Sequence, residues 1–326
     1  MKVTIYSSHA FDKPYLAKAS QAKHQLTFVE ESLNEKTLNL AKGSEAVCLF
    51  SGDDASEKIL ESLHKLHVKY IALRMTGYDN VDLKKCRQMG IKVANVPSYS
   101  PSTIAQHAMT LVLCLNRKIK LSQQLIKQHD FRLDQLIGFN MDNKVIGIIG
   151  TGKIGSAFAR IAHGFGCKLL AFDITEDASL KKATSIEYVT LDELCKNSDI
   201  ISLHCPLNDS TKHLLHKDKF KLMKDGAFII NTSRGGVINT QDLLEALDNK
   251  KIAAAGLDVY EFEKGLFFKN HPQVNDPLFN SLQARSNVII TGHQAFLTEE
   301  ALKNIADTTI YNLDCWNAGK ISKNEI

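Results

Sequence analysis

Residues 144–155 read KVIGIIGTGKIG, an apolar run of strand length that leads directly into the glycine pattern GxGxxG. A helical pattern follows from Ser156 to Phe165, so the glycines occupy a strand-to-helix turn. Glycines in such a turn let the backbone approach a ligand closely, and the helix N-terminus presents unpaired N–H groups to a pyrophosphate. We predict a dinucleotide site at Gly150, Gly152 and Gly155, with a tight turn that binds nothing as the alternative.

An acidic residue at the end of the next apolar run indicates which dinucleotide binds. That run, residues 168–172, is followed by Asp173, which lies 18 positions after Gly155. The fold presents a carboxylate there to the ribose hydroxyls of adenosine. A carboxylate also repels the 2′-phosphate of NADP, so we expect NAD. The alternative role, a helix cap, requires a helix directly after Asp173, and residues 174–178 only weakly form one.

Strand-length apolar runs alternate with helical patterns both before and after this motif. They form two series, which predicts two parallel α/β sheets. We expect two Rossmann-like or flavodoxin-like domains, each a mostly parallel sheet with helices on both faces, and a cleft between them. The predicted strands are residues 3–6, 26–29, 46–50, 70–73 and 91–96 in the first series and 144–149, 168–172, 200–203, 228–231, 252–257 and 288–291 in the second.

Two prolines mark the boundary between the series. Pro97 and Pro101 interrupt regular structure in residues 96–102, which we interpret as part of a hinge. Residues 104–115 follow and are apolar on nearly every helical face. Such a helix must be buried, either between domains or against another subunit.

The last helical stretch decides the domain limits. It runs from Thr298 to about Trp316, follows the last predicted strand and is too short to form a domain. We expect it to pack on the first sheet. The prediction is a discontinuous substrate-binding domain of residues 1–99 and 298–326, and an NAD-binding Rossmann domain of residues 100–297.

Composition and charge exclude several classes of protein. Hydrophobic residues make up 44% and charged residues 23%, which is typical of globular chains. The net charge of +4 is spread along the chain without a dense basic run, so nucleic acid is not an expected partner. No stretch reaches the roughly 18 apolar residues of a membrane helix, and the first residues do not resemble a signal peptide. We expect a cytoplasmic protein without a membrane partner.

Cysteine and histidine spacing gives no indication of a metal. The seven cysteines form no CxxC pair, and several lie in apolar runs, so we expect buried free thiols. His64 and His67, and likewise His213 and His216, are spaced like ligand pairs but lack acidic or thiol companions. We interpret both pairs as solvated helix faces.

Three polar residues follow successive strands of the second series. Arg234 lies in the stretch NTSRGG of residues 231–236, Glu263 follows the stretch AGLDVY of residues 255–260, and His293 lies in GHQAF of residues 292–296. Alone, each is explained as a surface charge or a hydrogen-bonded bystander. Parallel strands, however, bring their carboxyl ends to one crevice, where a nicotinamide would lie.

These side chains suit the reduction of a carbonyl group by NADH. The cofactor supplies hydride, so the protein must supply a proton and a cation for a substrate carboxylate. Our hypothesis is that His293 donates the proton as imidazolium and that Glu263 orients its ring and stabilises the charged form. Arg234 would hold the carboxylate through its planar fork.

Other strand ends are less decisive. Gly77, in the stretch LRMTGYDNVD of residues 73–82, could bind the substrate carboxylate through backbone N–H groups, or could lie in a turn without a ligand. Cys205 and Pro206, after the strand of residues 200–203, could face the adenosine or its ribose, or could form a plain turn.

Together these motifs resemble the D-isomer-specific 2-hydroxyacid dehydrogenase family, and within it the fermentative D-lactate dehydrogenases of bacteria. The resemblance covers essentially the whole chain and rests on residues 69–74, 77–82, 150–155, 231–235, 258–261 and 292–296. It implies a D-specific, NAD-dependent reaction on pyruvate and a homodimer or homotetramer. It also implies catalytic roles for Arg234, Glu263 and His293, substrate contacts by Gly77, Tyr99, Arg234 and Phe296, and cofactor contacts by Lys153, Ile154, Asp173, Cys205, Pro206, Thr232, Ser233, Arg234 and Asp258.

Two other functions compete with this prediction. A related enzyme could act on another 2-keto acid, such as phenylpyruvate, hydroxypyruvate or glyoxylate, because Thr76 and residues 262–286 match the family less well. A protein that senses NAD(H) and recruits partners could keep the same fold, although the chain lacks basic patches and long disordered tails.

Overall fold

The computed structural model describes residues 1–326 and forms two compact units. The first unit comprises Met1–Ser100 and Leu297–Ile326, and the second comprises Pro101–Phe296. Each unit contains one sheet, of five and seven strands respectively, and every ladder between named strands is parallel. The predicted α/β class, with two parallel sheets, is confirmed.

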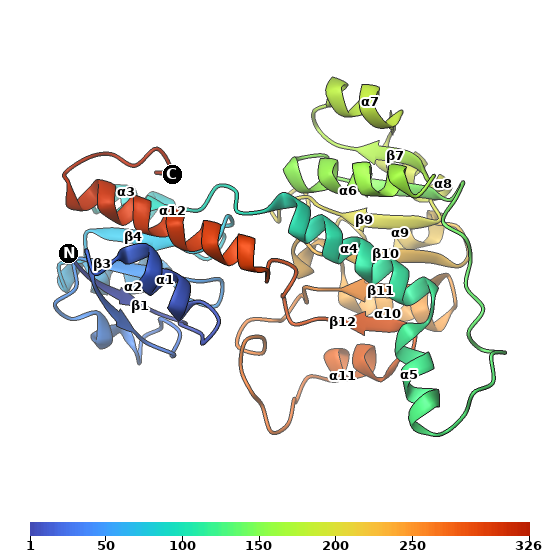
Figure 1. Cartoon of the computed structure of the whole chain (residues 1–326), viewed down its shortest axis with the longest axis horizontal. Helices are drawn as coiled ribbons and strands as arrows, with labels where there is room; N and C mark the ends of the chain where they lie inside the picture. The colour runs from blue at the N-terminus through green and yellow to red at the C-terminus, as the bar shows by residue number, and fades with distance from the viewer. The chain divides into compact units, whose positions relative to one another are not determined.

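The first unit is a five-stranded sheet in the order β2-β1-β3-β4-β5 (Figure 1). Helices α1 and α12 cover one face through a cluster that includes Leu16, Leu313 and Trp316, while α2 covers the other face through Leu60 and Leu63. The elements are β1 (Lys2–Ile5), α1 (Lys13–Ser20), β2 (Gln25–Phe28), the 3-10 helix η1 (Leu38–Ala41), β3 (Ala46–Leu49), α2 (Glu57–Lys65), β4 (Tyr70–Leu73), α3 (Leu83–Gln88), β5 (Lys92–Ala94) and α12 (Glu299–Asn317).

A buried ion pair lies at the carboxyl ends of the strands in this unit. Arg74 follows β4, is only 2% exposed, and donates from Nη1 to the carboxylate of Asp12. Its Nη2 donates to the carbonyls of Tyr6 and, at 3.0 Å, Ser7, just after β1. The guanidinium therefore ties the chain after β4 to the chain after β1. Removing one partner of such a pair leaves the other charge buried without compensation.

We therefore expect Arg74→Ala to destabilise the first unit by about 3–5 kcal/mol, since Asp12 would remain buried without its cation. Denaturant unfolding followed by circular dichroism measures the change. The control is Lys58→Ala, which breaks an ion pair with Glu35 whose side chains are 73% and 63% exposed. The control should cost less than about 1 kcal/mol. Equal losses in the two variants would contradict the structural role given to Arg74.

The second unit is a seven-stranded sheet in the order β12-β11-β10-β9-β6-β7-β8. Helices α4, α6 and α7 cover one face, and α8, α9, α10 and α11 cover the other. Its elements are α4 (Pro101–Asn116), α5 (Ile119–Lys127), β6 (Val145–Ile149), α6 (Lys153–Gly164), β7 (Lys168–Phe172), α7 (Ala178–Thr184), β8 (Glu187–Tyr188), α8 (Leu191–Asn197), β9 (Ile200–Leu203), α9 (Lys217–Leu222), β10 (Ala227–Asn231), the 3-10 helix η2 (Gly235–Val237), α10 (Thr240–Asp248), β11 (Ile252–Leu257), α11 (Pro277–Ala284) and β12 (Val288–Ile290).

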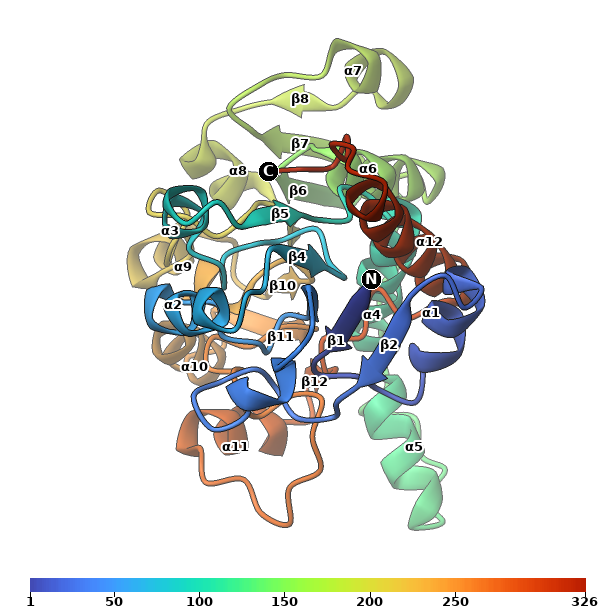
Figure 2. The same ribbon diagram turned by 90° about the vertical axis from the view of Figure 1, so that its left-hand side faces the viewer.

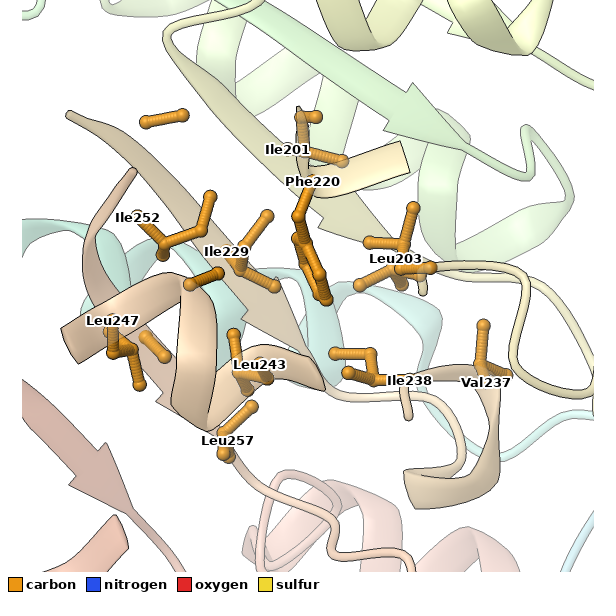
Figure 3. Close-up of a cluster of buried hydrophobic side chains, with 14 of the residues drawn as sticks. Ile201, Leu203, Phe220, Ile229, Val237, Ile238, Leu243, Leu247, Ile252 and Leu257 are labelled. Atoms are coloured by element: carbon orange, nitrogen blue, oxygen red, sulfur yellow. The ribbon is translucent and has the colours of Figure 1, made fainter. Parts of the chain in front are cut away.

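Buried side chains hold this sheet in a fixed position under its loops. Figure 3 shows Phe220 from α9 and Leu243 from α10 packed among Ile201, Leu203 and Ile229 of the central strands. All five side chains are at most 2% exposed. Complete burial of a large apolar side chain contributes roughly 1.5–3 kcal/mol, so this face is a rigid base for the strand ends.

The structure corrects two local expectations. Helix α4 begins at Pro101 itself, because proline is tolerated in the first turn of a helix, where its missing N–H leaves no bond unmade. The apolar faces of α4 pack on the sheet of the second unit through residues such as Ala108 and Val112, so neither a domain boundary nor another subunit is needed to bury them. The short edge strand β8 was not predicted.

All seven cysteines are free, as predicted, and five of them are buried. The longest helices, α4 and α12, are too short or too polar to cross a membrane, and the same holds for the others.

Candidate active site

The order of strands in the second unit places one crevice above β6 and β9. The chain runs outward from β6 through β7 to β8 on one side, and from β9 through β10 and β11 to β12 on the other. Helices that follow neighbouring strands then leave on opposite faces, and ligands of such sheets bind where the direction reverses. Every predicted residue of the second unit follows a strand of this sheet.

The glycine turn after β6 has the shape that a phosphate group requires. Gly150 has φ +91°, and a Cβ on Gly155 would lie 1.9 Å from the carbonyl oxygen of Gly150. Gly152 has no atom within 4 Å of its ideal Cβ position and caps α6 without a side-chain hydrogen bond. The first N–H groups of α6, including those of Lys153 and Ile154, have no partner within the helix, as at any helix N-terminus.

Asp173 lies beside this turn rather than at a helix end. Its Oδ2 accepts hydrogen bonds from Thr151 N at 2.5 Å and from Thr151 Oγ1 at 3.1 Å. The N-terminus of α7 is capped by Asp177, whose Oδ1 accepts from Ser179 N and Leu180 N. The helix-cap alternative for Asp173 is wrong, and the carboxylate stands next to the glycine turn as a ribose ligand would.

The turns after β9 and β10 follow the carboxyl ends of the two strands that come next after β6 on one side of the sheet. Asn231 Oδ1 accepts from Ser233 N and Ser233 Oγ, at 3.0 and 2.8 Å, and thereby shapes the turn. Thr232 Oγ1 is buried and has no hydrogen-bond partner within the protein. An orphaned buried hydroxyl among predicted cofactor contacts fits a bound ligand. Cys205 is buried and Pro206 is exposed.

A neutral histidine lies under the glycine turn. The ring of His204 packs 5.0 Å from the Phe158 ring of α6, Nε2 pairs with Ser202 Oγ at 2.9 Å, and Nδ1 is buried without a partner. Its Cβ lies 3.4 Å from the ideal Cβ position of Gly155. Burial disfavours the imidazolium and lowers the pKa of His204 to about 3.

This histidine should make the second unit sensitive to acid. The folded state binds the proton of His204 only near pH 3, whereas the unfolded chain binds it below about pH 6.5. Stability is therefore unaffected above that pH and falls by up to about 1.4 kcal/mol for each pH unit below it. We expect His204→Gln, which is neutral throughout, to show a shallower loss in denaturant unfolding between pH 6.5 and pH 4. Identical slopes would show that His204 is charged in the fold.

His293 and Glu263 form a close pair after β12 and β11. His293 Nδ1 lies 2.7 Å from Glu263 Oε1, and the two side chains are 19% and 23% exposed. Glu263 Oε2 accepts from Tyr260 N at 2.9 Å, which fixes the carboxylate. The ring of Phe268 lies 5.8 Å from that of His293. With Nδ1 engaged, Nε2 is the nitrogen that can exchange a proton with a substrate.

A buried aspartate holds the turn that carries this histidine. Asp258 Oδ1 accepts from Thr291 Oγ1 at 2.5 Å and from Gln294 N at 2.9 Å, and Oδ2 accepts from Ala295 N at 2.9 Å. Its carbonyl accepts from His293 N at 2.7 Å. His293 has φ +55°, a left-handed conformation that non-glycine residues seldom adopt. The bonds to Asp258 compensate the strain at this position.

Asp258 remains ionised although it is fully buried. Burial raises the pKa of its carboxyl, but the hydrogen bonds from His107 and Thr291 and the charge of His293 outweigh burial and hold the pKa below its ordinary value. His107 lies on α4, with Nε2 3.1 Å from Thr291 Oγ1 and 3.4 Å from Asp258 Oδ1. The hydrogen bonds that hold the His293 turn therefore extend, through His107, to α4.

Arg234 lies in the turn between β10 and η2. Its carbonyl accepts from Asn231 Nδ2 at 2.9 Å, and its Nη1 donates to the Ser233 carbonyl at 2.9 Å. The next residue, Gly235, packs so closely on the backbone after β11 that a Cβ would lie 2.0 Å from the Tyr260 carbonyl carbon. The Arg234 turn therefore contacts the chain before Glu263, and Asp258 in that chain in turn binds the backbone of His293.

The other predicted substrate residues divide between the units. Phe296 is 7% exposed at the end of the second unit. Gly77 and Tyr99 belong to the first unit, where Asn80 Nδ2 holds the Gly77 loop through the Phe50 carbonyl at 3.1 Å and Asn304 Nδ2 donates to the Tyr99 carbonyl at 2.6 Å. Their contacts with a substrate stay a prediction.

The sequence misplaced His213. It is not on a solvated helix face but in a turn, with its ring 33% exposed and Nε2 2.6 Å from Glu261 Oε1. The sequence also gave no indication that Asp258 clamps the His293 turn or that His107 joins it. The only signal was position, since Asp258 directly follows a predicted strand.

Comparison with known proteins agrees with this geometry. Residues 109–295 match the model of the D-isomer specific 2-hydroxyacid dehydrogenase NAD-binding domain. A D-lactate dehydrogenase of Escherichia coli K12 is 46% identical over 329 residues, which cover 100% of both chains. The solved apo-structure of the D-lactate dehydrogenase from that species has a TM-score of 0.90 at 45% identity and full coverage of both chains. A D-lactate dehydrogenase from Aquifex aeolicus complexed with NAD and lactic acid has a TM-score of 0.89 at 32% identity, covering 97% of this chain and 96% of that one.

Proposed function

The chain belongs to the D-isomer-specific 2-hydroxyacid dehydrogenase family, and we propose that it reduces pyruvate to D-lactate with NADH. It is an NAD-dependent oxidoreductase by family. The choice of pyruvate rests on relatives that are named D-lactate dehydrogenases and are similar along the whole chain. The observation that carries the proposal is the His293–Glu263 pair, at 2.7 Å, on the same sheet edge as the glycine turn.

The proton is the part of the reaction that the protein supplies. The cofactor, when bound, provides the hydride that reaches the carbonyl carbon. His293 donates its Nε2 proton to the oxygen that develops negative charge, and Glu263 holds the ring in position through Nδ1. In the reverse direction the neutral ring accepts the hydroxyl proton.

The substrate carboxylate needs a cation, and Arg234 is the one we assign to it. Asn231 and the close packing of Gly235 fix its turn, so the backbone that carries the guanidinium is restrained. A guanidinium binds a carboxylate through two parallel hydrogen bonds. Gly77, Tyr99 and Phe296 are proposed as further substrate contacts.

The cofactor contacts are also proposed residue by residue. The turn of Gly150, Gly152 and Gly155 would let the pyrophosphate approach, and the N–H groups of Lys153 and Ile154 at the start of α6 would bind it. The carboxylate of Asp173 would bind the ribose. The remaining proposed contacts, after β9, β10 and β11, are Cys205, Pro206, Thr232, Ser233, Arg234 and Asp258.

Pyruvate should oxidise NADH in the presence of this protein, and the lactate formed should be the D isomer. His293→Ala should lower turnover by about 100- to 10,000-fold while NADH binding, followed by fluorescence, persists. Reduction should fall as the solution becomes alkaline, because it needs imidazolium, and oxidation of D-lactate should rise. Rates that are flat from about pH 5 to 9 in both directions would remove His293 from this role.

A panel of keto acids separates pyruvate from its rivals. Faster reduction of phenylpyruvate, hydroxypyruvate or glyoxylate would assign a different substrate to the same chemistry. Tight binding of NADH without turnover of any keto acid would instead support a sensing role.

We also propose that the protein is a homodimer, or a homotetramer built from dimers, joined through the second unit. Helix α5 buries none of its residues and, as Figures 1 and 2 show, projects from the rest of that unit. The loop that follows exposes three large apolar side chains, Phe131 at 70%, Leu133 at 73% and Ile137 at 76%. Several large apolar side chains exposed within one short segment are typical of an interface between subunits.

The double variant Phe131→Asp/Leu133→Asp should therefore be monomeric, because charges would replace apolar side chains in the interface. Light scattering coupled to gel filtration measures the mass. The control Ile174→Asp changes another large apolar side chain, which is 99% exposed and lies outside this surface, and should leave the mass unchanged. A monomeric unaltered protein would refute the proposed assembly.

The cytoplasm is the proposed compartment. All seven thiols are free, which suits a reducing environment.

A further inference from the structure

We propose that His213 and Glu261 form a hydrogen-bonded clasp that positions the Arg234 turn for binding the substrate carboxylate. The inference rests on the carboxylate-binding role proposed above for Arg234. His213 and Glu261 are positioning residues, because they act through the backbone of other residues. They form a second histidine–carboxylate pair in the second unit, distinct from His293 and Glu263.

The pair is short and well anchored. His213 Nε2 lies 2.6 Å from Glu261 Oε1, and Glu261 Oε2 accepts from Thr240 N at 3.0 Å. The side chains are 33% and 14% exposed, so the contact is largely shielded from solvent. Glu261 thereby binds the first residue of α10, the helix that follows the Arg234 turn.

On one side, the clasp is attached to the chain directly after Arg234. His213 N donates to the Gly236 carbonyl at 2.8 Å, and Leu215 N donates to the Val237 carbonyl at 3.1 Å. Leu215 also forms a parallel bridge with Ile238. The segment around His213 therefore runs alongside η2 and restrains it. His213 itself has φ +50°, so its backbone needs such support.

On the other side, the clasp is attached to the chain before Glu263. Glu261 follows Tyr260, whose backbone contacts Gly235 so closely that no side chain fits there. The Arg234 turn is consequently held between two segments, one around His213 and one at Tyr260 and Glu261. The contact between the two side chains joins these segments across the turn.

The contact matters here through its geometry rather than through its contribution to stability. A single side-chain hydrogen bond adds only a small net amount to the free energy of unfolding. What a short directional contact adds is a single geometry for the loops that it joins. The expected consequence is a precise location for Arg234, which would be expressed in substrate affinity rather than in the proton transfer of His293.

Two variants of His213 separate positioning from general damage. His213→Asn is too short to reach Glu261, whereas the longer amide of His213→Gln can place a donor near the position of Nε2. We expect His213→Asn to raise the KM for pyruvate by about 10- to 100-fold, the scale of a binding group displaced by about 1 Å. Turnover at saturating pyruvate and the Kd for NADH should change little, and His213→Gln should restore most of the affinity.

A double-mutant cycle tests the pairing itself. Glu261→Gln should raise the KM for pyruvate, and adding it to His213→Asn should raise the KM no further, because the clasp is already open. Additive effects, or equal loss of turnover and NADH binding in His213→Asn, would overturn the proposal. The matched control is His24→Asn, which breaks the partly buried contact with Asp314, 3.0 Å long, in the first unit and should leave the KM unchanged.

Hydrogen exchange gives a readout that needs no substrate. Amides of Val237, Ile238 and Asn239 donate to the carbonyls of Arg234, Gly235 and Leu215, so they should exchange faster in His213→Asn and at the normal rate in His213→Gln and His24→Asn. Unchanged exchange in His213→Asn would refute the clasp even if pyruvate is the substrate. If the unaltered enzyme does not reduce pyruvate, the proposed substrate fails while exchange still decides the clasp.

Discussion

The hydrogen bonds of Asp258 are the constraint on which the site depends. A carboxylate that is 0% exposed is tolerated only if nearly all of its acceptor capacity is used. Asp258 satisfies this condition by binding the backbone and side chains of residues 291–295, the turn that holds His293 in a left-handed conformation. Without these bonds the turn would relax, and the imidazole would lose its alignment with Glu263.

The turn after β6 and the turn after β10 both depend on close backbone contacts that only glycine permits. Gly155 lets α6 approach the carbonyl of Gly150, and Gly235 lets the Arg234 turn approach Tyr260. In each case a Cβ would lie at or under 2.0 Å from another backbone atom, so the loops could not keep their separation with any other residue. Charged and polar side chains then fix the loops that the glycines have brought together, through Asp173 in one half and Asp258 in the other.

Much of the fold follows from local patterns, because buried parallel strands are continuous apolar runs. Strands β4, β7, β9 and β11 match their predicted limits, while β8, with two residues, is too short to leave such a pattern. The predicted helix of residues 104–115 begins earlier, at Pro101, because proline interrupts an extended segment but is tolerated in the first turn of a helix. The faces that α4 buries could not be predicted, since an apolar helix carries no information about which surface covers it.

The site was predictable to the extent that topology decides it. Residues that follow parallel strands converge whatever their separation along the chain, and this placed Arg234, Glu263 and His293 at neighbouring strand ends. Contacts within the loops are different, because a partner 48 positions away leaves no local signal. His213 and Glu261 are such a pair, and the spacing of His213 and His216 pointed instead to a helix, whereas His213 lies in a turn and α9 begins only at Lys217.

The two histidine–carboxylate pairs show why geometry of a pair does not by itself define catalysis. His293 with Glu263 and His213 with Glu261 have N–O distances of 2.7 and 2.6 Å, and both histidines have left-handed backbones. They differ in what surrounds them. His213 binds the backbone beside η2, and its own backbone N–H is used to hold that segment, so the pair joins loops. His293 stands at the end of β12, in a turn that hydrogen bonds to Asp258 hold, and its ring is engaged through Nδ1 by Glu263. The rings of His293 and His213 are 19% and 33% exposed, so exposure does not separate the two pairs. The assignment of the proton donor to His293 therefore rests on its position at the carboxyl end of a sheet strand, where ligands of parallel sheets bind.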